Sequence, residues 1–117
     1  MSYDVRIYVK VEGCNKYHPI AVPEYDSPTY NLRNMFVACM DWDYKQGEYY
    51  KCDFVIDKIQ YGLRELTINK ELYEKYNPPN GWGNIESAIE FFYSLIECIE
   101  ETIQYDEIPI NCLYIRW

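Results

Sequence analysis

The sequence predicts an α+β domain with a small two- to three-stranded sheet, formed by the N- and C-terminal strands and covered by three to four helices. Three observations favour this fold. Apolar and polar residues alternate near the N-terminus, helical apolar patterns fill the middle of the chain, and a second alternating segment ends it. The length of 117 residues fits a single domain, residues 1–117.

The first strand is predicted from strict alternation. Val5, Ile7 and Val9 share one face of an extended chain, and polar or amphipathic residues occupy the positions between them. Gly13 ends this segment, and the prolines that follow are typical of a loop. Because a two-stranded ribbon alone is marginal in water, we expect a third strand within residues 17–24.

Helical spacing of apolar residues predicts four helices in the middle of the chain. Their expected ranges are residues 31–40, 53–66, 69–76 and 85–104. A residue type that favours the N-cap stands at the start of each, and these residues are Asn31, Asp53, Asn69 and Asn84. Residues 110–117 predict the final strand, with Leu113, Ile115 and Trp117 on one face.

Composition indicates a globular protein, which we expect in the cytoplasm of the cell that makes it. The net charge is −8, and the chain has 14 tyrosines, which is too aromatic for a disordered segment. The N-terminus has no signal-peptide pattern, and no apolar run approaches the roughly 18 residues of a membrane span. The five cysteines are odd in number and widely spaced, so we expect reduced structural thiols.

The longest predicted helix carries an acidic stripe on its polar face. At 100° per residue the stripe comprises Glu86, Glu90, Tyr93, Glu97, Glu100 and Glu101. No Lys or Arg occurs between Lys75 and Arg116. Glutamates four positions apart destabilise a helix by about 0.2–0.5 kcal/mol per pair, and acids near its C-terminus oppose the macrodipole. A helix selected for stability alone would avoid this arrangement.

The acidic stripe has two interpretations. As a functional surface it presents a carboxylate about once per turn over roughly 22 Å, which suits contact with a basic surface of a partner protein. As an ordinary surface it is the solvated face of an acidic protein. Inward-facing carboxylates, or cations supplied from elsewhere in the molecule, would remove the functional interpretation.

A second candidate site lies around the most pronounced break in the chain, the turn Asn-Pro-Pro-Asn-Gly-Trp-Gly at residues 77–83. Exposed aromatic rings and amides there could hold a nucleotide-like small molecule by stacking and hydrogen bonding. The residues of this alternative site are Tyr30, Asn31, Asn77, Asn80, Gly81, Trp82 and Gly83. The competing interpretation is structural, because a Trp before a helix commonly packs the loop onto the core.

Catalytic and metal-binding patterns are missing from the sequence. The single histidine, His18, has only Cys14 nearby, which is far short of a catalytic triad or a zinc site. Asp41 and Asp43 lack the rest of a calcium-binding loop. We therefore expect no enzymatic activity, no cofactor and no bound metal.

Nucleic acid and membranes are not expected as direct partners. The cations form no cluster along the chain, and neutralisation of phosphates drives nucleic-acid affinity. The oligomeric state is left open by the sequence.

The patterns Thr29-Tyr30-Asn31-Leu32 with Met35-Phe36, and residues 77–83 followed by an acidic amphipathic helix, support a resemblance. The chain resembles small uncharacterised proteins of phages, prophages and mobile elements of Gram-positive bacteria from residue 28 onward. The resemblance implies an accessory role, such as inhibition of a host defence in the manner of anti-CRISPR proteins or sequestration of a nucleotide signal. A small virion or assembly protein is a further alternative.

These observations favour a non-catalytic inhibitor that binds a basic, nucleic-acid-handling host protein through the acidic stripe. The nucleotide-binding alternative would use the Tyr30 and Asn31 region together with the turn at residues 77–83.

Overall fold

Four short strands form one antiparallel sheet in the order β2-β1-β4-β3, in a computed structural model that describes residues 4–25, 28–81 and 83–117. The strands are β1 (Arg6–Val9), β2 (His18–Ala21), β3 (Tyr49–Lys51) and β4 (Leu113–Arg116). The predicted α+β class is confirmed, and so is the strand expected within residues 17–24. The sheet has one strand more than expected, because β3 adds to the free edge of β4.

The N- and C-terminal strands pair at the centre of the sheet, as predicted. Ile7 of β1 lies opposite Ile115 of β4, so the apolar faces of the two strands point the same way. Both side chains are fully buried. Pro19 is tolerated in β2 because this strand lies at an edge of the sheet, where a missing N–H breaks no central ladder.

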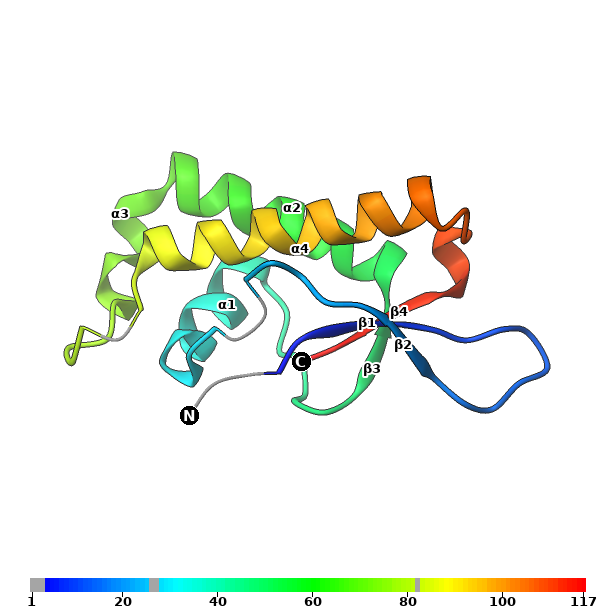
Figure 1. The fold of residues 1–117 in the computed structure, drawn as a ribbon. Helices are drawn as coiled ribbons and strands as arrows, with labels where there is room; N and C mark the ends of the chain where they lie inside the picture. Colours follow the sequence, from blue (N-terminus) through cyan, green and yellow to red (C-terminus); the bar gives the residue numbers. More distant parts are fainter. Residues whose placement is uncertain (1–3, 26–27, 82) are drawn as a thin grey trace.

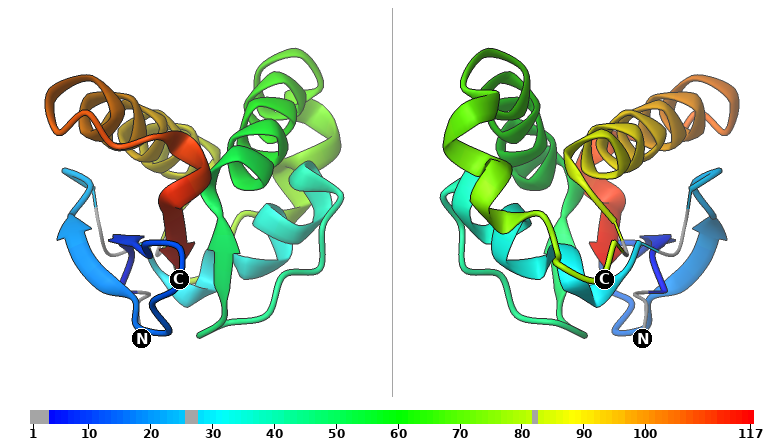
Figure 2. Two further views of the ribbon diagram at one scale, coloured as in Figure 1. Left: turned by 90° about the vertical axis from the view of Figure 1, so that its right-hand side faces the viewer. Right: turned by 90° about the vertical axis from the view of Figure 1, so that its left-hand side faces the viewer.

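The helices are α1 (Arg33–Met40), α2 (Cys52–Ile68), α3 (Lys70–Tyr73) and α4 (Ile85–Tyr105), with 3₁₀ turns η1 (Tyr30–Leu32), η2 (Glu74–Tyr76) and η3 (Ile110–Cys112). The long helices α2 and α4 run antiparallel and side by side on one side of the sheet (Figures 1 and 2). Their buried stripes follow the predicted helical spacing, as Val55, Ile59 and Leu63 show in α2. None of the described helices combines the length and apolarity needed to cross a bilayer.

The core is centred on an aromatic cluster around Trp117, which is 2% exposed. The ring of Tyr44 lies 4.8 Å from that of Trp117, and the rings of Phe91 and Phe36 lie at 5.6 and 6.1 Å. These residues come from α1, α4, the end of β4 and the loop before β3. The cluster therefore holds the helices to the sheet and fixes where α4 runs.

Two of the predicted helix starts are wrong. Asn31 lies inside η1 and forms no side-chain cap of α1; instead its backbone N–H donates to the hydroxyl oxygen of Thr29 (3.3 Å). Thr29 supplies the acceptor that opens this turn. Asp53 lies in the first turn of α2 rather than at its cap, because β3 runs directly into the helix at Lys51.

The other predicted helix starts agree with the structure. Asn84 caps α4, where its side-chain oxygen accepts the backbone N–H of Ser87 (2.8 Å). Asn69 precedes α3, although its side chain donates to Glu65 rather than capping the helix.

Candidate functional site

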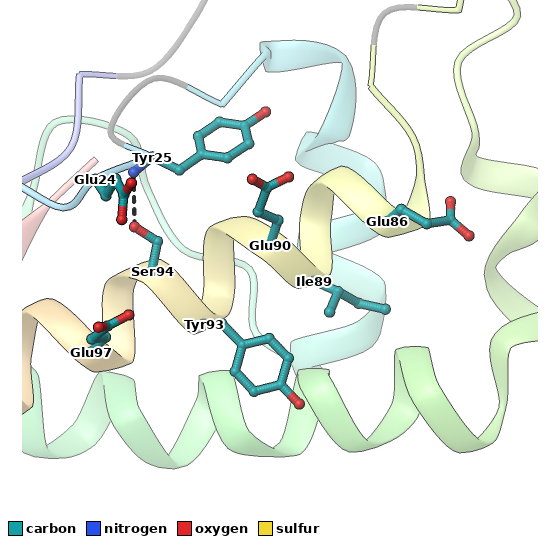
Figure 3. Close-up of a pocket in the computed structure, with 8 residues that line it drawn as sticks. All are labelled: Glu24, Tyr25, Glu86, Ile89, Glu90, Tyr93, Ser94 and Glu97. Carbon is teal, nitrogen blue, oxygen red and sulfur yellow. Dashed lines mark hydrogen bonds between the residues drawn. The ribbon is translucent and has the colours of Figure 1, made fainter.

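A surface groove of about 830 Å³ runs along α4, between this helix and the segment that follows β2 (Figure 3). Its lining combines four carboxylates with two tyrosines, one isoleucine and one serine. The lining residues are Glu24, Tyr25, Glu86, Ile89, Glu90, Tyr93, Ser94 and Glu97. We refer to this feature as the acidic groove.

One wall of the acidic groove is held in place by two contacts. The backbone N–H of Tyr25 donates to the hydroxyl oxygen of Ser94 (2.8 Å). The ring of Tyr25 meets the buried ring of Phe91 edge-on, with centroids 6.0 Å apart. Together these contacts attach the chain after β2 to the middle of α4.

The other wall is the surface of α4 itself. Glu86, Glu90 and Glu97 differ by four and seven positions, so the helical period places them along one side of α4. Figure 3 shows Glu90 pointing toward the ring of Tyr25. Burial raises the pKa of Tyr25, and the nearby charge of Glu90 raises it further.

One cation lies beside the acidic groove. Lys70, the first residue of α3, pairs with Glu86 at 2.9 Å. This hydrogen bond and charge lower the pKa of Glu86 and raise the pKa of Lys70. A cation from elsewhere in the molecule therefore compensates the stripe at Glu86, and the functional interpretation is removed for that position. Among the described residues, Glu90 and Glu97 form no ion pair.

The acidic stripe faces solvent, as the functional interpretation requires. Its members are all exposed, and Tyr93 is 60% exposed. The groove brings Glu86, Glu90, Tyr93 and Glu97 together, whereas Glu100 and Glu101 lie further along α4 and do not line it.

Four lining residues were missed by the sequence analysis. Glu24 and Tyr25 come from a segment about 70 positions before the middle of α4, and nothing in the sequence links the two. Ile89 and Ser94 are neighbours of stripe positions, and their exposure depends on how α4 is turned against the core.

The alternative ligand site is in part a structural feature. The side-chain oxygen of Asn77 accepts the backbone N–H of Ile85 (3.1 Å), so this amide already holds the start of α4. Gly81 and Gly83 both have positive φ, of 76° and 91°. A Cβ at Gly83 would lie 2.8 Å from the Thr29 side chain, so the turn packs closely against the segment before α1.

This packing brings the turn next to η1, as the alternative site requires. Asn31 and Asn80 are exposed. Trp82 and the side chain of Tyr30 lie outside the described residues.

The thiols and the histidine form no reactive set among the described residues. Burial raises the pKa of Cys39 and of Cys52 to about 12, and that of Cys98 to about 11. All five cysteines are free, and His18 is exposed in β2. No group of three His, Cys, Asp or Glu side chains in the described ranges could hold a metal ion.

The lining of the groove is suited to the recognition of cations. Its carboxylates accept hydrogen bonds from Arg or Lys, and Ile89 and Tyr93 provide apolar contact for the aliphatic stems of such side chains. The hydroxyl oxygen of Ser94 in this lining already accepts the backbone N–H of Tyr25. No known protein family, curated protein or solved structure matches this chain.

Proposed function

We propose that this protein is a non-catalytic binding protein whose acidic groove engages a basic segment of a partner protein. The observation that carries the proposal is the lining of the groove, where four carboxylates meet two tyrosines and the nearby Lys70 pairs with Glu86 alone. A basic partner gains charge-assisted hydrogen bonds there, and the carboxylates speed its approach. Tyrosine is among the residues that binding interfaces favour.

The kind of partner follows from the charge and from the resemblance to accessory proteins of phages and mobile elements. Nucleic-acid-handling proteins have basic surfaces, because their affinity depends on neutralising phosphates. A line of carboxylates can occupy such a surface in place of nucleic acid. We therefore propose a counter-defence inhibitor, similar in action to anti-CRISPR proteins.

Sequestration of a nucleotide is the weaker candidate. Asn77, the amide at the start of the 77–83 turn, is already hydrogen-bonded to the backbone of Ile85. Its loss would also disturb the start of α4, so its structural role accounts for its position.

The experiment compares capture of bacterial proteins by two matched variants. The groove variant, Glu90→Gln/Glu97→Gln, removes two charges from the lining, and neither side chain forms an ion pair within the described part of the chain. The control variant, Asp57→Asn/Glu71→Gln, removes two charges from exposed positions on α2 and α3. Each protein is immobilised and incubated with a Gram-positive lysate, and the captured proteins are quantified by mass spectrometry.

We expect a basic protein that the unmodified chain and the control variant capture equally, and that the groove variant captures at least tenfold less. Two lost charge-assisted contacts, each worth about 1.5–3 kcal/mol, are sufficient for this loss. If the groove variant captures the same proteins in the same amounts, the acidic groove is not a binding site.

A further inference from the structure

The face of the sheet that is turned away from α2 and α4 gathers tyrosines and cations. Strand register places them in two rows. One row is Arg6, Arg116 and Tyr49, and the next is Tyr8, Tyr114 and Lys51. Lys10 and Tyr17 extend the rows toward the β1–β2 hairpin. We call this surface the tyrosine face, and its members are Arg6, Tyr8, Lys10, Tyr17, Tyr49, Lys51, Tyr114 and Arg116.

The rings of the tyrosine face form an ordered stack. Tyr17 and Tyr49 lie parallel, with centroids 3.8 Å apart and an interplanar angle of 4°. Tyr114 meets Tyr17 edge-on at 5.0 Å, and Tyr8 meets Tyr49 edge-on at the same distance. All four rings are only half-buried.

A cation lies at each end of this stack. The ammonium of Lys10 is 5.1 Å from the centroid of Tyr17, and the guanidinium of Arg116 is 5.5 Å from that of Tyr49. Because the two rings fill each other's inner faces, the cations occupy the outer faces. The Nε of Arg116 donates to the carbonyl of Gly47 (3.1 Å), which orients its planar group over the ring.

The charge of this face is opposite to that of the whole protein. The chain has 19 acidic residues and a net charge of −8, yet the tyrosine face gathers four cations. Glu12 lies at one border of this face, where it shares a hollow with Lys10 and Tyr114. Asp4 also lies at a border of the face, in a hollow of about 340 Å³ that Arg6 and Arg116 also line. The four cations come from three separate parts of the sequence, because Arg6 and Lys10 belong to β1 and the residue after it, Lys51 to β3 and Arg116 to β4. The pairing of the strands brings these three parts together.

Stability alone does not explain this arrangement. Arg6 lies directly opposite Arg116 in the register, and like charges at such positions destabilise a sheet. Among the described residues, the side chains of Arg6 and Lys51 are exposed and have no ion pair. A small aromatic cluster that only held the hairpin in place would not need Arg6 and Lys51.

We propose that the tyrosine face binds single-stranded nucleic acid. Arg6, Lys10 and Lys51 would contact phosphates, and unpaired bases would stack on the oriented guanidinium of Arg116 and on the neighbouring rings. Exposed bases stack on aromatic rings and on guanidinium planes, and cations along the same surface follow the backbone. A duplex gains only the phosphate contacts, because its bases already stack on one another.

This inference is independent of the acidic groove, which is built from different residues. It differs from the expectation that nucleic acid is not a direct partner, and the experiment below distinguishes the two. That expectation depended on the order of cations along the chain, whereas the sheet determines their order in space.

The test measures binding of fluorescein-labelled 12-nucleotide single strands, of mixed-sequence RNA and DNA, by fluorescence anisotropy at 50 mM salt. The variant Arg6→Gln/Lys51→Gln removes two cations that make no packing contact in the stack. The control variant Arg64→Gln/Lys75→Gln makes the same change in net charge at exposed positions on α2 and η2. Circular dichroism and a urea titration establish that each variant is folded.

We expect the unmodified protein and the control variant to bind the single strands with similar Kd, and Arg6→Gln/Lys51→Gln to bind at least tenfold more weakly. The slope of log K against log salt should fall in magnitude by about 1.4 in that variant, because each lost phosphate contact on a single strand contributes about 0.7. The inference is overturned by absence of binding up to 100 µM protein, by equal weakening in the control variant, or by equal affinity for a duplex or a polyglutamate peptide.

Discussion

The hydroxyl of Ser94, in the middle of α4, accepts the backbone N–H of Tyr25 across 69 positions of sequence, at 2.8 Å. This hydrogen bond connects the two walls of the acidic groove, together with the edge-on contact between the rings of Tyr25 and Phe91. It also explains why the groove has a defined shape although one of its walls is a loop.

Replacing Ser94 with Ala should lower the free energy of unfolding by about 1 kcal/mol, because the N–H of Tyr25 loses its partner in a half-buried position. Ser94→Thr keeps the acceptor and serves as the control. Urea titrations measure the stability, and amide hydrogen exchange at Tyr25 measures the local effect. Unchanged exchange in Ser94→Ala would show that the hydrogen bond does not hold the wall.

Two of the three asparagines that the sequence predicts as helix caps, Asn31 and Asn84, should behave differently. Asn84→Ala should lower the free energy of unfolding by about 1 kcal/mol, because its side-chain oxygen accepts the N–H of Ser87. Asn31→Ala should change it by less than about 0.5 kcal/mol, because this exposed side chain caps no helix. Urea titration of both variants checks the difference, and equal losses would contradict the assignment of Asn84 as the cap.

The two glycines of the 77–83 turn provide a second matched pair. Gly81→Ala should lower the free energy of unfolding by about 1 kcal/mol, because φ is 76°. The added Cβ itself meets no described atom within 4 Å outside the neighbouring residues. Gly83→Ala should cost at least about 2 kcal/mol, because the added methyl also meets the Thr29 side chain at 2.8 Å. Urea titration ranks the two, and a smaller loss for Gly83→Ala would show that the turn is not packed against η1.

The buried thiols should make stability depend on pH in the alkaline range. An unfolded cysteine loses its proton near pH 8.5, whereas burial raises the pKa of Cys39 and Cys52 to about 12. Between these values the unfolded state binds fewer protons, so the free energy of unfolding falls as pH rises. It should be constant from pH 7 to 8 and decrease by pH 10 in urea titrations.

A double variant separates the thiols from the tyrosines, which ionise in the same range. Cys39→Ala/Cys52→Ala should be less stable than the unmodified protein at pH 8, because it leaves cavities. Between pH 8 and 10 its free energy of unfolding should fall by less than that of the unmodified protein. An identical pH dependence would show that these thiols do not contribute.

The sequence was most informative where one signal was strong and local. The helix expected over residues 85–104 is α4, Ile85–Tyr105, because a cap at Asn84 and a long amphipathic pattern define it independently. The final strand placed Leu113, Ile115 and Trp117 on the buried face, as alternation predicted.

The sequence was least informative for elements whose formation depends on a neighbouring strand or helix. The strand β3 has three residues and no apolar alternation, and it exists because Tyr50 pairs with Ile115 across the edge of β4. The helix α2 then begins at Cys52, one residue before Asp53, because β3 leads straight into it.

The candidate sites were predictable only in part, for the same reason. The stripe on α4 follows from helical geometry and is exposed as expected. The contributions of Tyr25, Ser94 and Lys70 depend on contacts between distant segments, which no local pattern encodes. The tyrosine face was missed altogether, because its cations are adjacent only after the strands pair.

The separation of charge between the helix layer and the sheet affects which surface of the protein another macromolecule binds. Its shortest dimension is 23 Å, whereas electrostatic potential decays over about 8 Å at physiological ionic strength. The electrostatic potential that acts on an approaching macromolecule is therefore set by the charges of the nearest surface rather than by the net charge of the protein. On this basis an acidic protein can be retained by an anion exchanger through α4 and by heparin through its strands.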